Sequence, residues 1–231
     1  MLFVCIALSH VAAQDKTIAL EEVFITDSRF KIKRENSGKV VHKISNRQIE
    51  NSVGKNIVEL ISEVAGIEIN GSQGVGGQNL SYYIRGGRSN EVVILIDGIQ
   101  VIDPLQNSYD LRFLNLEQVA SVEIIKGAAS TLYGSGAATA VIDIRLKKAE
   151  KGEVNVFISS SLGTNNTSED SNFNLNTTDN AVNLNGSLDK FNYLISFGHH
   201  NSEGMSASKS TVSKEFTDDP FKRLNTSLHL G

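Results

Sequence analysis

At 231 residues the chain is long enough for one or two domains with cores of ordinary size. Its formal net charge of -4 gives no basic field, which argues against a protein that binds nucleic acid. With 19 glycines, 2 prolines and no tryptophan, the composition suits strands and turns better than helices.

The first 13 residues have the pattern of an export signal. Residues 2–8 form an apolar stretch, and the small residues at positions 11 and 13 suit cleavage after Ala13. The alternative is a frayed apolar N-terminus, because no lysine or arginine precedes the apolar stretch. Cys5 is the only cysteine and falls inside this segment, so cleavage would leave a mature chain without cysteine. We expect residues 1–13 to be a signal peptide.

Residues 14–37 contain a short β-prone run that is followed by a charged stretch. An extended apolar segment near a free terminus suits the addition of a strand to the edge of a partner's sheet. An ordinary first strand of the domain is the alternative. The run consists of Glu22, Val23, Phe24, Ile25 and Thr26.

Residues 38–79 predict two strands and two helices, followed by a loop. Residues 38–44 form the first strand, and Ser45 with Gln48 fits a capping box that begins a short helix. A second helix is expected over residues 54–64, where apolar residues share one face, and Gly66 ends it. Residues 67–69 form the next strand. Residues 70–79 contain four glycines and no periodicity, which predicts a loop.

A β-hairpin over residues 91–102 is the feature around which the rest is arranged. Residues 91–96 are an aliphatic strand, Asp97 and Gly98 are a two-residue turn signal, and residues 99–102 return. We expect this hairpin to be buried in a small domain. In front of it, residues 82–85 form a strand that ends with Arg85 beside a Gly-Gly pair.

Residues 105–146 are expected to complete this domain. A polar loop at residues 105–109 and a partly helical connection at 111–119 lead to a strand at 121–125, which ends at Lys126. One helical turn at residues 128–132 precedes a final strand at 141–146. The prediction is an α+β domain with a small mixed sheet and short helices. Arg85 and Lys126 either meet carboxylates outside this domain or are ordinary exposed cations.

After a charged link at residues 147–152, apolar and polar residues alternate over long segments. Strands of about ten residues with one apolar and one polar face are typical of a transmembrane barrel wall and also of a soluble sandwich. No stretch after residue 13 approaches the roughly 20 apolar residues of a spanning helix, so any membrane residence must come from strands. Four strands cannot close a barrel, so the barrel interpretation predicts a truncated chain.

No constellation of residues predicts an enzyme, a metal site or a cofactor. Gly134 and Gly136 lack the helix that follows the glycines of a dinucleotide-binding loop. His199 and His200 lie in strand-like sequence without ligand spacing. Asp97 is explained by its turn. We therefore expect no catalytic residue, no metal and no cofactor.

Four motifs follow one another in the first domain: YIRG at residues 83–86, VVILIDG at 92–98, VEIIKG at 122–127, and LYG with AVIDI within 132–144. With these motifs the sequence resembles the plug domain of TonB-dependent outer-membrane receptors of the cobalamin and siderophore type. The resemblance covers residues 38–146, and the segments after residue 152 resemble the start of the family's β-barrel.

The resemblance implies a domain order and a function. Residues 1–13 would be the signal peptide, 14–37 a periplasmic segment, 38–147 the plug and 148–231 the N-terminal, incomplete part of the barrel. The implied function is energy-coupled import of a scarce solute such as cobalamin, a ferric siderophore or haem, with the plug gating the pore in the outer membrane. Residues 22–26 are similar to the box that binds the periplasmic domain of TonB, which the inner-membrane complex energises. Outer-membrane lipid would surround the barrel.

The same resemblance implies roles for individual residues. Arg85 and Lys126 would pair with carboxylates on the inner barrel wall. The alternative to a transporter is a secreted, plug-like binding module without a barrel. Contact with the solute would fall to apical plug loops, whose candidates are Ser72, Gln73, Gln78, Asn79, Arg88, Ser89, Asn90, Gln106, Asn107 and Tyr109.

Overall fold

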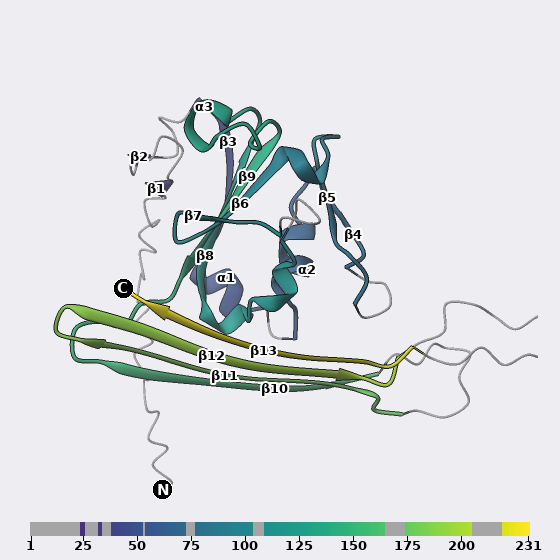
Figure 1. The fold of residues 1–231 in the computed structure, drawn as a ribbon, viewed down its shortest axis with the longest axis vertical. Coiled ribbons are helices and arrows are strands. Elements are labelled where there is room, and N and C mark those ends of the chain that lie inside the picture. The colour runs from purple at the N-terminus through teal and green to yellow at the C-terminus, as the bar shows by residue number, and fades with distance from the viewer. Residues whose placement is uncertain are drawn as a thin grey trace, which may run out of the picture.

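The computed structural model describes residues 24–25, 32–33, 38–52, 54–72, 77–103, 109–164, 174–204 and 219–231. An N-terminal domain over residues 38–146 rests against one face of a four-stranded antiparallel sheet (Figure 1). None of the helices within the described ranges is long and apolar enough to cross a membrane.

A five-stranded mixed sheet forms the centre of the N-terminal domain. Its order is β3 (Val40–Ile44), β8 (Val119–Lys126), β9 (Ala140–Leu146), β6 (Val92–Ile96) and β7 (Ile99–Val101). Strands β6 and β9 are parallel, and the other neighbours are antiparallel. Since β6 is buried along its whole length, its aliphatic sequence is that of an interior strand.

The hairpin of β6 and β7 is present, but only half of it is buried. Asp97 and Gly98 both have positive φ, 49° and 81°, as a two-residue hairpin turn requires. Asp97 Oδ1 accepts a hydrogen bond of 3.1 Å from the amide of Leu146, which ties the turn to the end of β9. The expectation of a fully buried hairpin is wrong for β7, because β7 is the edge strand and Ile99 is 72% exposed.

Two short helices follow β3 as the capping signals predict. Helix α1 (Asn46–Glu50) begins with the capping box of Ser45 and Gln48. Helix α2 (Ile57–Ser62) begins later than predicted, because Asn56 caps it by accepting hydrogen bonds from two amides of its first turn. Gly66 lies beyond its end with φ of 78°, as expected for the residue that ends a helix.

The two faces of the five-stranded sheet have separate cores. The larger one is shared with α1, α2 and the two-stranded ladder of β4 (Ile67–Asn70) and β5 (Ser81–Ile84). On the other face α3 (Ser130–Tyr133) covers a smaller cluster. Fully buried members of the larger core include Ile57, Ile61, Tyr82, Ile84, Leu111, Ile124, Ile142 and Ile144.

Three 3-10 helices occupy the connections of this domain. The first, η2 (Ser89–Glu91), leads into β6. The other two, η3 (Leu111–Phe113) and η4 (Leu116–Gln118), form the partly helical connection that was predicted before β8. They bring the chain down to the four-stranded sheet, where the two parts of the molecule meet (Figure 1).

The four-stranded sheet runs in chain order from β10 (Val154–Gly163) through β11 (Thr177–Leu188) and β12 (Phe191–Ser202) to β13 (Phe221–Leu230). The predicted alternation is confirmed, because one face is apolar and exposed while the other carries buried polar groups. Only the polar face meets the N-terminal domain. The exposed apolar side chains include Val154, Val156, Ile158, Leu162, Val182, Leu188, Phe191, Ile195, Phe197, Leu224, Leu228 and Leu230.

Candidate functional site

The contact between the N-terminal domain and the four-stranded sheet is a continuous set of neutral hydrogen bonds, which we call the seam. Asn115 Nδ2 donates to Ser196 Oγ at 2.6 Å, and Asn225 Nδ2 donates to Asn115 Oδ1 at 2.9 Å and to the carbonyl of Phe113 at 3.0 Å. Ser227 Oγ donates to Gln118 Oε1 at 3.4 Å. The polar face of the sheet thus holds the η3–η4 connection.

Buried polar groups of the sheet support the seam from below. Ser196 is 1% exposed and donates its hydroxyl to Asn183 Oδ1, and Asn183 is 2% exposed. Both residues face inward on neighbouring strands, where the register pairs them directly. Lys147 adds a contact at the edge of the seam, with its ammonium 4.5 Å from the centre of the Phe157 ring. Sequence reasoning missed this site, since Asn115 carries no local signal for a partner on strands so far along the chain.

Tyr82 holds the segment that precedes the seam. Its hydroxyl donates to the carbonyl of Tyr109 at 2.7 Å and accepts from the amide of Leu111 at 3.4 Å. Burial raises the pKa of the Tyr82 hydroxyl far above its ordinary value. The hydroxyl therefore stays protonated and serves as a donor. Its two hydrogen bonds connect β5 to the start of η3.

Arg112 joins two of the predicted solute loops. Its guanidinium donates to both carboxylate oxygens of Asp110, at 2.9 and 2.8 Å, and to the carbonyl of Gln78. Tyr109 precedes this pair, and burial together with Asp110 raises the pKa of its hydroxyl. The structure therefore brings Gln78 and Tyr109 into one region near the four-stranded sheet.

The other candidate residues of the solute loops are more widely distributed. Ser72 Oγ donates to the carbonyl of Ile69 at 2.9 Å, and Ser89 Oγ accepts from the amide of Tyr82 at 2.8 Å. The amide of Arg88 donates to Glu91 Oε2 at 3.0 Å, and residues 88–91 form the η2 turn that leads into β6. Arg88, Ser89 and Asn90 thus belong to η2 and its N-cap. Asn79 is exposed beside Gln78, while Gln73, Gln106 and Asn107 lie outside the described residues.

Arg85 and Lys126 come together at the end of the domain where β5 and β8 stop. Lys126 is 8% exposed and donates to the carbonyl of Ala65. Burial and the neighbouring charge of Arg85 both lower the pKa of the Lys126 ammonium. Arg85 has φ of 52° and is exposed. Within the described part of the chain neither cation forms an ion pair, so their pairing with carboxylates of a barrel wall stays a prediction.

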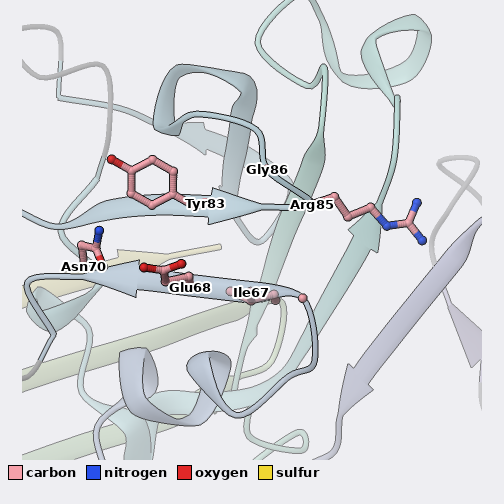
Figure 2. Close-up of a pocket in the computed structure, with 7 residues that line it drawn as sticks. Ile67, Glu68, Asn70, Tyr83, Arg85 and Gly86 are labelled. Carbon is pink, nitrogen blue, oxygen red and sulfur yellow. The ribbon is translucent and has the colours of Figure 1, made fainter.

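A shallow hollow of about 510 Å³ borders Arg85 on the exposed face of the β4–β5 ladder. Glu68 and Tyr83 are cross-strand partners along it. Figure 2 shows Asn70 beside them on β4, while Arg85 extends past the end of β5. The hollow is lined by a carboxylate, an amide, a phenol and a guanidinium. These groups suit contact with a polar surface outside the domain.

A row of charges crosses the other face of the five-stranded sheet, and the sequence did not single it out. Lys43 Nζ lies 3.5 Å from Glu123 Oε1, and Arg145 donates to Asp143 Oδ2 at 2.6 Å. Asp143 is 1% exposed, and its Oδ1 has no hydrogen-bond partner among the described residues. Burial raises the pKa of Asp143, against the opposing charge of Arg145, and Glu123 adds to the rise. The signal in the sequence that could have revealed Asp143 is an acidic residue in the middle of a largely aliphatic strand, β9.

The β-prone run near the N-terminus is only partly described. Phe24 and Ile25 form β1, which pairs antiparallel with β2 (Ile32–Lys33). Glu22, Val23 and Thr26 lie outside the described residues. Within the described residues β1 pairs with one neighbour, β2.

No group of three or more metal-ligating side chains occurs within the residues that the structure describes. The described geometry offers hydrogen bonds, charged groups and packing surfaces for recognition. The contacts between the two parts of the molecule are its most developed feature.

Known proteins resemble this chain in both sequence and fold. Residues 33–141 match the model of the TonB-dependent receptor plug domain. The vitamin B12 transporter BtuB of Vibrio cholerae is 32% identical over 143 residues, which are 62% of this chain and 23% of the relative. The chain thus spans about a quarter of the length of the curated relatives it matches.

Solved structures show the same fold. A ferric enterobactin receptor mutant, PfeA of Pseudomonas aeruginosa in complex with enterobactin, has a TM-score of 0.57 and 23% identity over 72% of this chain and 25% of its own. The siderophore receptor PiuA of Acinetobacter baumannii has a TM-score of 0.58 and 21% identity, covering 89% of this chain and 25% of its own. These two likenesses concern the domain and the strands that follow it.

Proposed function

Residues 33–141 are a plug domain of the TonB-dependent receptor family, and from this premise we propose that the protein is an outer-membrane receptor for energy-coupled import of a scarce solute. In this proposal the four-stranded sheet is the first part of the barrel wall, and the N-terminal domain is the plug that closes the pore. The protein acts by binding and gating, without covalent chemistry.

The observation that carries the proposal is the two-sided character of the four-stranded sheet. Its outer face exposes isoleucine, leucine, valine and phenylalanine, while its inner face carries buried asparagine and serine against the plug. A wall between lipid and a polar lumen requires this distribution. A secreted module would expose the same apolar stripe to water, where a large apolar surface is a liability. This consideration favours the receptor over the binding module.

The solute belongs to the classes that the relatives' names suggest, and cobalamin is the first candidate. The BtuB relative shares 32% identity with this chain over 143 residues. A ferric siderophore or haem is the next candidate. We place the contact with the solute at Gln78 and Tyr109, because Arg112 and Asp110 fix these two plug segments beside the inner wall.

TonB is the proposed partner, and residues 22–26 are its proposed binding segment. The extended backbone of Phe24–Ile25 fits pairing with a strand of TonB, with the N-terminus in the periplasm. A pull-down of the periplasmic TonB domain with a peptide of residues 20–29 tests this assignment. We expect binding by the natural peptide and loss of binding with Val23→Pro, since proline removes a backbone donor. Equal binding by both peptides would rule the segment out.

The import proposal is tested by deleting the gene and limiting the cell in turn for cobalamin, iron and glycans. We expect a growth defect under one limitation, with restoration by the full gene product. Uptake of the corresponding radiolabelled solute then measures import directly. Normal growth and uptake under all three limitations would contradict the proposal, and a soluble, secreted gene product would support the binding module instead.

A further inference from the structure

Asn115 lies at a position where asparagine ordinarily has another role. It is the N-cap residue of η4, yet its side chain makes no hydrogen bond to the backbone of that helix. Both ends of its carboxamide are used on the four-stranded sheet instead, by Ser196 and Asn225. The Asn115 side chain therefore does not cap its own helix and instead joins the N-terminal domain to the four-stranded sheet.

Gly198 provides the room for this contact. It is buried on the inner face of β12, between Ser196 on its own strand and Asn225, its cross-strand partner on β13. A methyl group added at Gly198 would lie 2.6 Å from Asn115 Oδ1 and 2.7 Å from Asn225 Oδ1. Both distances are shorter than any ordinary contact of a carbon atom. Any larger residue at this position would force Asn115 or Asn225 to move from the observed arrangement.

We propose that Gly198, Ser196 and Asn225 form a socket for Asn115, and that this socket sets the position of the plug on the barrel wall. The wall groups lie on two neighbouring strands in fixed register, so they specify the position of Asn115 in two directions. The inference rests on the proposed function only in treating the four-stranded sheet as barrel wall. Figure 1 shows the base of the plug next to this sheet, and the η3–η4 connection contacts the sheet there through Phe113 and Asn115.

All the groups in the socket are uncharged, which sets its strength and its response to salt. A single neutral hydrogen bond contributes little to net stability, and leaving its buried partners unpaired costs more than the bond contributes. Salt screens ionic contacts and has little effect on neutral ones. The socket is therefore a weak contact of high geometric precision that salt does not loosen.

The socket also reaches the proposed solute segment. Tyr82 fixes this segment at Tyr109 and Leu111, and the socket fixes it at Asn115. Because the short η3 turn lies between these points, a shift at Asn115 moves the residues that follow Tyr109. Asn115 is thus a positioning residue that acts on solute binding through its neighbours.

A double-mutant cycle on the full gene product tests the socket. In a variant of the full gene product from which all natural cysteines, Cys5 included, have been removed, Val122→Cys places a single thiol in the plug core, where Val122 is 0% exposed, and its maleimide labelling rate measures plug opening. We expect Asn115→Ala and Gly198→Ala each to raise this rate by roughly threefold to tenfold. In the double variant Gly198→Ala should add less than it does alone, because Asn115, one of the two side chains that the methyl meets, is gone and Asn225 can turn into the space it leaves.

The matched control is Gly163→Ala, on the inner face of β10. A methyl group there meets only Thr177 at an ordinary 3.7 Å, so we expect an unchanged labelling rate. A general loss of stability would multiply the two single effects in the double variant, and that outcome would overturn the socket. The labelling rate does not depend on solute import, so a socket that fails here leaves the receptor function to be decided by uptake.

Discussion

The hydroxyl of Tyr82 donates to the carbonyl of Tyr109 at 2.7 Å, which joins a strand of the plug to the segment proposed to meet the solute. The ring is 1% exposed, so this bond forms inside the core and fixes the segment from within. The seam on the barrel wall then holds the same segment from outside.

Tyr82→Phe should release this segment while leaving the ring in place. The change removes the donor to Tyr109 and the acceptor of the Leu111 amide, so we expect a loss of about 1–2 kcal/mol in the free energy of unfolding of the plug. Faster hydrogen exchange at Leu111 is the local signature. Tyr83→Phe is the control, because Tyr83 is 38% exposed on the other face of β5. Equal exchange in both variants would contradict the role of Tyr82.

Asp143 should make the stability of the plug depend on pH. Its raised pKa means that the folded plug holds a proton at this site more readily than the unfolded chain does. The stability it contributes is present at low pH and is lost as pH rises from about 4, the ordinary range of aspartate, through the raised pKa. Asp143→Asn removes this titration. The free energy of unfolding of the variant, relative to that of the natural plug, should therefore increase as pH rises.

Urea unfolding of the plug at several pH values measures this difference. Glu68→Gln, at an exposed acid on β4, is the control and should follow the natural protein at every pH. Parallel curves of stability against pH for the natural protein and Asp143→Asn would show that Asp143 does not titrate as we infer.

Two isoleucines of the same sheet should differ sharply in their contributions to stability. Ile142 is 0% exposed in the central strand β9, and Ile142→Ala is expected to cost about 2–5 kcal/mol. Ile99 is 72% exposed on the edge strand, so Ile99→Ala should change stability by less than about 0.5 kcal/mol. The same urea experiment measures both, and similar losses would place β7 in a packed layer.

Arg85 offers a test of ionic locking between plug and wall. If it pairs with a wall carboxylate in the full gene product, Arg85→Gln should speed plug opening at low salt and have less effect at high salt. Arg88→Gln is the control, since Arg88 is an exposed cation nearby at the start of η2. Identical opening rates for Arg85→Gln and the natural protein at low salt would remove this role and leave the fold assignment intact.

Local signals predicted much of the fold. The capping box at Ser45, the turn at Asp97 and the alternation in β11 and β12 each depend on a few neighbouring residues, and each is present in the structure. The order of the five-stranded sheet depends on contacts between distant segments, which no local pattern encodes. For that reason the exposure of β7 was not foreseen.

The candidate site was less predictable than the fold, for the same physical reason. The Asn115 socket joins residues about 80 positions apart in the chain, and an isolated asparagine gives no sign of such a partner. The loops near Gln78 and Tyr109 were predicted from the resemblance, but the Arg112 bridge between them depends on how β5 and η3 pack. Arg88 and Asn90 were predicted from the same resemblance, and the structure places them at the η2 turn that leads into β6.

The most direct test of the central claim is uptake of the identified solute in cells with and without TonB. We predict accumulation against a gradient in the natural strain and no accumulation after loss of TonB or in the Val23→Pro receptor, with solute binding retained. Val23→Ile keeps a β-branched residue and should retain uptake. Accumulation that is unchanged by the loss of TonB would contradict the claim that this protein is an energy-coupled receptor.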